Sequence, residues 1–150
     1  MALTGNIRVP STASGALAFP CRKRTILVAE DSLDSLEMLE VLLELKGYAV
    51  VSAADGHRAV EVAVREVPDL ILIDLELPGL DGLAVVKELR LHPELMAVPI
   101  IIISGHDPAK YRTAALSAGC DDYLLKPIDF DRLDQILHER IPKAVRARTA

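Results

Sequence analysis

Five short apolar runs alternate with longer stretches of helical pattern along this chain of 150 residues. The runs are Thr25–Ala29, Ala49–Ala53, Leu70–Ile73, Val98–Ile103 and Tyr123–Leu125. Three of them are apolar on both faces, which is typical of strands buried inside a parallel sheet. Strands that alternate with helices through short connections predict a parallel sheet with helices on both faces.

The stretches between the runs carry helix signals. In Leu33–Lys46 leucines recur at helical spacing, and Gly47 follows as a natural stop. Asp107 and Pro108 have the residue types of an N-cap and a first helical residue. We therefore predict five helices, over Leu33–Lys46, Gly56–Glu66, Gly82–Leu91, Pro108–Ser117, and from a cap at Asp129 to about Ile141.

Charge and composition divide the chain into three segments. Residues 1–23 contain Pro, Ser, Thr, Ala and Gly without a period, and we expect a flexible N-terminal extension. Residues 24–141 form the expected domain, and 142–150 form a basic C-terminal tail. All 22 acidic residues lie within 25–141, so we expect no direct binding of nucleic acid.

Membrane and cysteine signals are weak. No apolar stretch approaches the ~20 residues of a membrane span, and the N-terminus does not have the charge order of a signal peptide. Cys21 and Cys120 have no evident disulfide partner, which indicates a reducing compartment, and we expect a cytoplasmic location. We interpret Cys120 as a small core residue.

Polar residues follow four of the predicted strands at the point where each strand ends. Glu30 and Asp31 follow the first strand and Asp74 the third. Ser104 follows the fourth and Lys126 the fifth. Each residue alone would be an ordinary cap or turn. Because the carboxyl ends of parallel strands share one edge of a sheet, the ordered set predicts a functional site there.

Three carboxylates at one edge repel each other, by about 4 kcal/mol for a pair at ~4 Å with an effective dielectric of 20. A hard divalent cation removes that cost. Oxygen ligands suit Mg²⁺, which shares such sites with phosphate groups, and Mn²⁺ is an acceptable substitute. Lys126 can pair with Asp74 or with a phosphate, and Ser104 can donate its hydroxyl to a phosphoryl oxygen.

Residues 25–141 resemble the response-regulator receiver domains of two-component signalling, and are similar to the single-domain chemotaxis regulator. The matching stretches are ILVAEDS (26–32), PDLILIDLELPGLDGL (68–83), IIIISG (100–105) and AGCDDYLLKP (118–127). The resemblance implies a flavodoxin-like fold, a doubly wound five-stranded parallel sheet with strand order 2-1-3-4-5 and five helices.

The resemblance also implies roles for the acidic residues. Asp74 would be the phosphoacceptor. Asp31 would bind Mg²⁺ directly, together with Asp74, and Glu30 would bind it through water. The backbone carbonyl of Glu76 would be a further ligand. None of these residues departs from the family pattern.

Other roles implied by the resemblance concern the opposite side of the site. Lys126 would bind the phosphoryl group and would precede a cis bond to Pro127. Ser104 and Tyr123 would form a switch pair, in which Ser104 turns toward the phosphate and Tyr123 fills the space behind it. Serine stands here where threonine is commoner, but the hydroxyl is kept. Leu77 and Ile128 replace a common methionine and phenylalanine, as packing changes.

Glu76 and His106 lie two residues after Asp74 and Ser104, where the family places side chains beside the attacking water. We hypothesise that this pair tunes the lifetime of the phosphorylated state. The alternative interpretation, two solvated loop residues, remains open. His57, His92 and His138 show no metal-ligand spacing.

The function expected from the resemblance is that of a stand-alone receiver. It would accept a phosphoryl group from a sensor histidine kinase or a histidine phosphotransfer protein, and would catalyse only its own phosphorylation and dephosphorylation. Its output would be binding to a downstream protein through the last two helices and the fifth strand, near Tyr123. A homodimer and the identity of the pathway are left open.

Three alternatives compete with this interpretation. The first is a receiver-like scaffold that binds partners without phosphorylation, although no required residue is missing. The second is a haloacid-dehalogenase phosphatase, which would need a second aspartate where Glu76 stands, and a cap domain. The third is a flavin-binding protein, in which Glu30 and Asp31 would repel the flavin phosphate.

Overall fold

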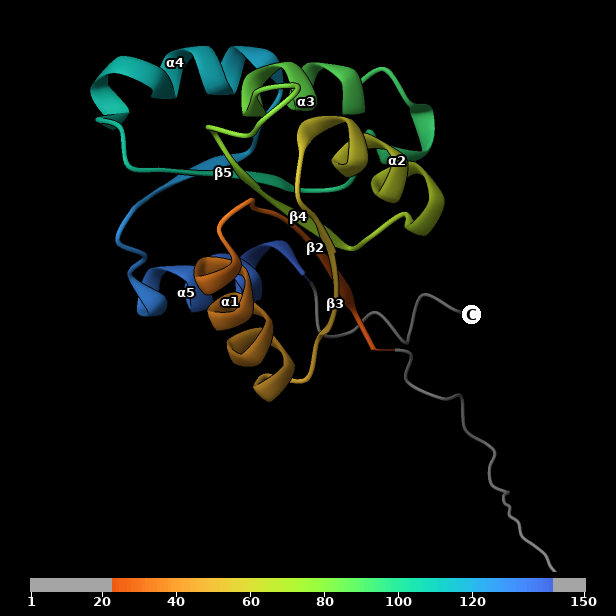
Figure 1. Ribbon diagram of the computed structural model, residues 1–150, viewed down its shortest axis with the longest axis vertical. Helices are drawn as coiled ribbons and strands as arrows, with labels where there is room; N and C mark the ends of the chain where they lie inside the picture. Colours follow the sequence, from red (N-terminus) through yellow and green to blue (C-terminus); the bar gives the residue numbers. More distant parts are fainter. Residues whose placement is uncertain (1–22, 142–150) are drawn as a thin grey trace, which may run out of the picture. The chain divides into compact units, whose positions relative to one another are not determined.

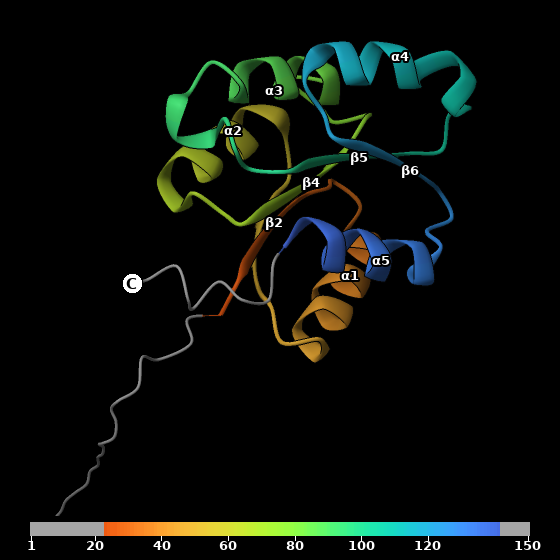
Figure 2. The same cartoon turned by 180° about the vertical axis from the view of Figure 1, so that it is seen from behind.

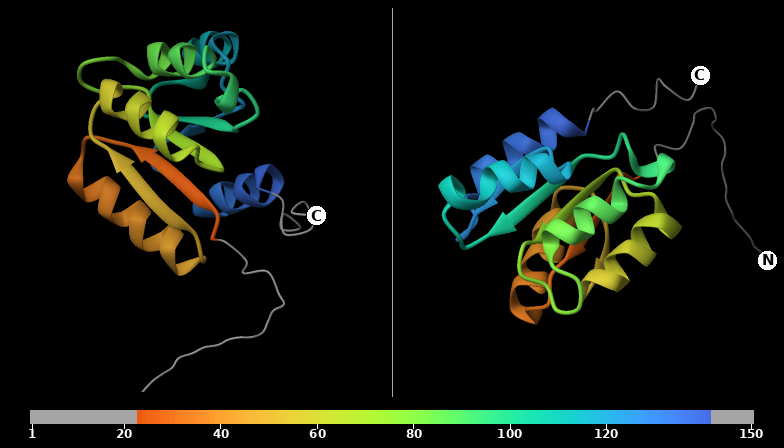
Figure 3. Two further views of the ribbon diagram at one scale, coloured as in Figure 1. Left: turned by 90° about the vertical axis from the view of Figure 1, so that its right-hand side faces the viewer. Right: turned by 90° about the horizontal axis from the view of Figure 1, so that it is seen from above.

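The computed structural model describes residues 23–141, in which five parallel strands form one sheet. The strands are β2 (Thr25–Ala29), β3 (Ala49–Ala53), β4 (Leu70–Asp74), β5 (Ile100–Ser104) and β6 (Asp122–Leu125). Their order across the sheet is β3-β2-β4-β5-β6, which confirms the expected order 2-1-3-4-5. Figure 3 shows β2 and β3 running side by side in the same direction. Apart from Lys23, the expected extension and tail lie outside the described residues.

Five α-helices lie between and after the strands, as predicted. They are α1 (Leu33–Leu45), α2 (Gly56–Glu66), α3 (Gly82–Leu89), α4 (Pro108–Ala118) and α5 (Phe130–Arg140). Helices α1 and α5 cover one face of the sheet, and α2, α3 and α4 cover the other (Figures 1 and 2). Every one begins at a side chain that accepts a backbone N–H: Ser32, Asp55, Asp81, Asp107 and Asp129. Such caps contribute about 1 kcal/mol each.

The sheet separates two apolar cores. Leu27, Ile71 and Ile73 pack toward α2 and α3, whereas Ile26 and Leu72 pack toward α1 and α5. Successive side chains of a strand point to opposite faces, so an unbroken apolar run supplies both cores at once. All five residues of β4 and of β5 are buried for this reason. The two central strands therefore end in a dry environment, which matters for the site at their carboxyl ends.

The sequence pattern placed the start of the fourth strand two residues too early. The strand begins at Ile100 and not at Val98, because Pro99 has no N–H to donate to a strand ladder. The carbonyl of Val98 instead accepts a hydrogen bond from Arg90. A short 3₁₀ helix, η2 (Pro93–Leu95), was not predicted. The other predicted ends differ from the observed ones by two residues or fewer.

Cys120 is buried, as expected of a core residue. Burial, reinforced by the charge of Asp121, raises the pKa of its thiol to about 11. A thiol that keeps its proton at neutral pH is a poor nucleophile. Within residues 23–141, no helix is long and apolar enough to cross a membrane.

Candidate functional site

Three carboxylates meet at the carboxyl edge of the sheet. Glu30 directly follows β2, Asp31 is the next residue, and Asp74 is the last residue of β4. Strands β2 and β4 are neighbours in the sheet, so their ends are adjacent. One oxygen from each carboxylate lies within 4.8 Å of the other two. Glu30 and Asp74 are buried, whereas Asp31 is exposed, so the cluster opens to solvent on one side.

Lys126 bridges the two buried carboxylates. Its Nζ lies 3.1 Å from Oδ2 of Asp74 and 3.4 Å from Oε1 of Glu30. Burial of the ammonium group opposes its charge, but the hydrogen bond to Asp74 and the charges of Asp74 and Glu30 outweigh burial and raise the pKa of Lys126. The lysine therefore stays protonated at neutral pH. One cation facing three carboxylates leaves the site with excess negative charge.

The backbone fixes the positions of the buried carboxylates. Oε2 of Glu30 accepts the N–H of Ser32 at 3.1 Å, and Oδ1 of Asp74 accepts the N–H of Glu76 at 3.0 Å. Burial, with the nearby charge of Asp74, raises the pKa of Glu30, although the bond from Ser32 acts in the opposite direction. A divalent cation beside Glu30 would favour its ionised form, so the chemistry of the cluster suits a metal ion.

Lys126 is positioned from two sides. Its backbone N–H donates to the carbonyl of Ser104 at 2.7 Å, which ties the end of β6 to the end of β5. The Lys126–Pro127 peptide bond is cis, as the resemblance implied.

Ser104 and Tyr123 both contact the backbone of His106. Oγ of Ser104 accepts the His106 N–H at 2.9 Å, and the Tyr123 hydroxyl donates to the His106 carbonyl at 3.2 Å. Both side chains are buried. The two residues expected to act as a switch pair are thus joined through the loop that leads into α4. The sequence indicated a role only for the side chain of His106, and this role of its backbone was not predicted.

The side chains of Glu76 and His106 pair with each other across the mouth of the site. Nε2 of His106 contacts Oε2 of Glu76, and the His106 ring lies 5.0 Å from the Tyr111 ring. The pair is largely exposed to solvent. It connects the loop after β4 with the loop after β5, next to Asp74.

The loop between β4 and α3 is held against the start of α2. The N–H of Gly56 donates to the carbonyl of Pro78 at 3.1 Å, and the N–H of Gly82 donates to that of Leu75 at 2.8 Å. A Cβ atom at position 56 would lie only 2.0 Å from the carbonyl oxygen of Leu80. This close approach positions the loop that carries Glu76, and nothing in the sequence pattern pointed to it.

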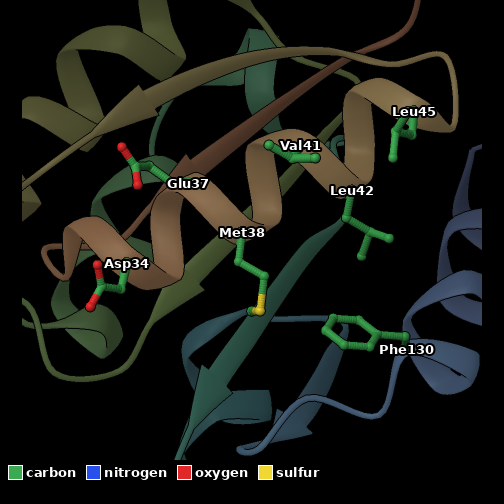
Figure 4. Close-up of a pocket in the computed structure, with 7 residues that line it drawn as sticks. All are labelled: Asp34, Glu37, Met38, Val41, Leu42, Leu45 and Phe130. Atoms are coloured by element: carbon green, nitrogen blue, oxygen red, sulfur yellow. The ribbon is translucent and has the colours of Figure 1, made fainter.

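An apolar groove of about 560 Å³ runs along α1 beside the start of α5 (Figure 4). Its lining residues are Asp34, Glu37, Met38, Val41, Leu42, Leu45 and Phe130. Figure 4 shows Met38 and Leu42 pointing toward Phe130. Val41 and Leu45 are 58% and 81% exposed, which is unusual for large apolar side chains that lie next to each other on one helix face. Nothing in the sequence pattern indicated this surface.

The acidic cluster and Lys126 at the carboxyl edge of the parallel sheet have the arrangement expected of a phosphoacceptor signalling domain, and comparison with known proteins agrees. The family model of the response regulator receiver domain matches residues 26–138. The chain belongs to this family of two-component signalling domains. That membership favours the receiver interpretation over the phosphatase and flavin alternatives.

Individual relatives support the same conclusion. The chain is 38% identical over 120 residues to the transcriptional regulatory protein ZraR of Salmonella typhimurium, covering 79% of this chain and 26% of that protein. It is 36% identical over 121 residues to the response regulator PleD of Caulobacter vibrioides, covering 81% and 26%. The chain thus spans about a quarter of the length of these relatives.

Solved structures share the fold. The receiver domain of the sensor histidine kinase PA1611 of Pseudomonas aeruginosa, which has a magnesium ion in its active-site cleft, superposes with a TM-score of 0.74 at 37% identity, covering 80% of this chain and 98% of that one. The chemotaxis response regulator CheY4 of Vibrio cholerae also gives a TM-score of 0.74, at 27% identity, covering 79% and 98%.

Proposed function

We propose that Asp74 accepts a phosphoryl group from a phosphohistidine on a sensor kinase or phosphotransfer protein, and that this modification controls binding to a downstream protein. The observation that carries the proposal is the position of Asp74. It ends a central, fully buried strand, beside two further carboxylates and in contact with Lys126. An aspartate in this setting is positioned for nucleophilic attack, and phosphoryl transfer needs mainly positioning and charge neutralisation.

A magnesium ion fits the residues present. Asp31 and Asp74 would bind it directly, Glu30 through water, and the carbonyl of Glu76 would complete the protein ligands. All of these donors are oxygen atoms, the ligands that Mg²⁺ and Mn²⁺ take. When bound, the ion supplies charge neutralisation for the phosphoryl oxygens. The magnesium in the cleft of the PA1611 receiver domain supports this assignment.

In the reaction, an oxygen of Asp74 forms a bond to phosphorus while the bond from phosphorus to the imidazole nitrogen of the donor breaks. The electron pair of the broken bond stays on the imidazole nitrogen, which takes a proton. The product is an acyl phosphate. Lys126, which now contacts Oδ2 of Asp74, would transfer its hydrogen bond to a phosphoryl oxygen. Later attack by water returns the carboxylate and inorganic phosphate.

The phosphoryl group would change the contacts of Ser104. A hydroxyl that turns to donate to the phosphate gives up its place as the acceptor of the His106 N–H. A charge-assisted contact contributes ~1.5–3 kcal/mol. Because Lys126 already contacts Asp74 before phosphorylation, only the new contact of Ser104 adds preference. It supplies about a quarter to a half of the ~5.5 kcal/mol that a switch from 1:99 to 99:1 needs. The loop at 105–107 is the element that this preference would move.

The direct test is phosphorylation itself. Acetyl phosphate or phosphoramidate, supplied with Mg²⁺, is expected to add one phosphoryl group to the protein, as read by intact mass. The Asp74→Asn variant keeps the shape of the side chain but loses the nucleophile, and we expect no gain in mass. A folded wild-type protein that binds Mg²⁺ but gains no phosphoryl group would instead support the scaffold alternative.

The pair of Glu76 and His106 is proposed to set the lifetime of the acyl phosphate by limiting the approach of water to Asp74. An exposed side-chain pair of this kind is worth ~0.2–1 kcal/mol, so Glu76→Ala or His106→Ala should accelerate dephosphorylation by ~1.4–5-fold. The loss of the phosphorylated mass with time measures the rate. Glu61→Ala, which removes the exposed pair with Arg58 on α2, is the matched control. Unchanged lifetimes in both variants would remove the pair from the mechanism.

We assign the groove beside α1 to the protein that donates the phosphoryl group. The groove begins at Asp34, three residues after Asp31, so a protein lying along it would reach Asp74. Its apolar floor and the acidic Asp34 and Glu37 would suit an amphipathic helix with basic flanks.

This assignment predicts that a substitution in the groove changes the rate of phosphoryl transfer from a protein donor but not from a small-molecule donor. Val41→Lys puts a charge on the apolar face and should slow transfer from a phosphorylated histidine phosphotransfer domain at least ~10-fold, because a buried interfacial charge costs more than 1.4 kcal/mol. Transfer from acetyl phosphate, which needs no docking surface, should be unchanged. Leu91→Lys, at an exposed site two residues after the end of α3, is the control. Equal rates from the protein donor in all variants would exclude the groove.

A further inference from the structure

Arg90, at the C-terminal end of α3, holds together several segments that are distant in sequence. Its guanidinium donates to the carbonyl oxygens of Leu95 (2.8 Å), Met96 (3.1 Å), Val98 (2.8 Å) and Gly119 (2.9 Å), and to Oδ2 of Asp121 (2.9 Å). The arginine side chain is only 19% exposed. Gly119 is the C-cap of α4, so this arginine is attached to the end of that helix.

Asp121 extends the attachment to two strands. Its Oδ2 also accepts the N–H of Ile100 at 2.9 Å, and its own N–H donates to the carbonyl of Ile100 at 2.7 Å. Gly119 has a φ of +118°, and a Cβ there would lie 2.8 Å from Cγ of Arg90. The C-terminal end of α4 is therefore fixed to α3 and to the starts of β5 and β6, on the edge of the sheet opposite to Asp74.

The N-terminal half of α4 is attached much less firmly. The buried residues of the helix, Ala115 and Ala118, both lie in its C-terminal half. In the first half, Pro108 and Tyr111 are half-buried and the other residues are exposed. The loop just before it is held by His106, whose contacts are Ser104, Tyr123, Tyr111 and Glu76. One end of α4 thus rests on a polar network, and the other on contacts that lead to Asp74.

We propose that Arg90 fixes the C-terminal end of α4, so that phosphorylation moves only the opposite end of this helix. When Asp74 is phosphorylated, a step that rests on the function proposed above, the loop and first half of α4 (105–113) move, while the second half and its cap (114–121) stay in place. The surface that changes is then the N-terminal half of α4. Arg90 acts here as a positioning residue, since it contacts neither Asp74 nor the acidic cluster among the contacts described.

The inference is tested by hydrogen–deuterium exchange with mass spectrometry on the full chain. Beryllofluoride with Mg²⁺ serves as the stable phosphoryl mimic, and intact-mass phosphorylation is recorded in parallel. In the wild type, we expect the mimic to change deuterium uptake in 105–113 and in the amides of 114–117, which donate to carbonyls of the first half of α4. We expect it to leave 118–121 unchanged. In Arg90→Ala without the mimic, the exchange rate of the amides in 114–121 should rise ~10-fold, because the charge-assisted bonds that protect this end of the helix are gone.

With the mimic, the change in Arg90→Ala should spread over 105–121, whereas phosphoryl uptake at Asp74 persists. Asp121→Asn, which keeps the size of the side chain but loses its charge, should give the same pattern if the alanine variant does not fold. Arg65→Ala, which removes an exposed arginine from α2, is the control. In the wild type, a mimic-induced change in 118–121 as large as that in 105–113 would overturn the inference, as would unaltered exchange of 114–121 in both variants.

The function proposed for Asp74 and the role proposed for Arg90 can be refuted separately. Absence of phosphoryl uptake and of any response to the mimic would refute the function proposed for Asp74. The exchange of 114–121 in the unphosphorylated Arg90→Ala and Asp121→Asn variants would still decide whether Arg90 fixes the C-terminal end of α4.

Discussion

Replacing Asp31 with asparagine is expected to lower the affinity for Mg²⁺ by at least ~100-fold, since even outer partners of metal ligands contribute 10–100-fold. Asp31 is the exposed carboxylate of the cluster, and its oxygen lies within 4.8 Å of those of Glu30 and Asp74. The asparagine amide offers the cation only a dipole, whereas the aspartate carboxylate offers a full negative charge. Without Asp31, Lys126 faces two carboxylates in place of three, so the excess charge that attracts a cation falls as well.

Isothermal titration with Mg²⁺ measures this effect directly, and phosphoryl uptake from acetyl phosphate at limiting Mg²⁺ should fall in parallel. Asp34→Asn provides the control, because it removes an exposed carboxylate from the first turn of α1, outside the cluster. If Asp31→Asn bound Mg²⁺ as tightly as the wild type, the assignment of the three carboxylates as the metal site would be wrong.

Gly56→Ala is expected to destabilise the fold by about 3 kcal/mol, at the upper end of the cost of overpacking. The new Cβ would meet the carbonyl oxygen of Leu80 at 2.0 Å and its Cβ at 2.5 Å. Backbone atoms cannot rotate away as a flexible side chain can. The loop at 76–82 must move, and the bond from the Gly56 N–H to the carbonyl of Pro78 is strained or lost.

Urea unfolding, followed by circular dichroism, gives the free energy of unfolding for both proteins. Gly105→Ala is the matched control, because a Cβ at position 105 meets no atom within 4 Å, and its expected change is within ~0.5 kcal/mol. A variant at position 56 that unfolds at the wild-type urea concentration would mean that the loop adapts without cost.

The architecture followed from the sequence because local and global signals agree. Apolar runs without alternation fit strands buried on both faces, and cap residues precede every helix. The order of the strands came from the family resemblance and was confirmed. The start of β5 was misplaced because Val98 is apolar like the strand residues. Only the missing N–H of Pro99 and the distant Arg90 end the ladder there.

The strand-end residues could be predicted because parallel strands deliver them to one edge. Glu30, Asp74 and Lys126 do meet there. The roles of the His106 backbone and of Arg90 could not, because each depends on contacts between loops far apart in sequence. The groove beside α1 was also missed, since residues such as Val41 fit an ordinary helix pattern until their exposure is known.

Strand β5 has a consequence for the unfolded chain. Residues 100–103 are four consecutive isoleucines, fully shielded in the native sheet by β4 on one side and β6 on the other. Uncharged β-branched segments of this kind pair readily with copies of themselves once exposed. Pro99 interrupts the segment at its start, which blunts such pairing. Heating at high concentration is therefore expected to end in precipitation rather than in reversible unfolding, with intermolecular association beginning at these isoleucines.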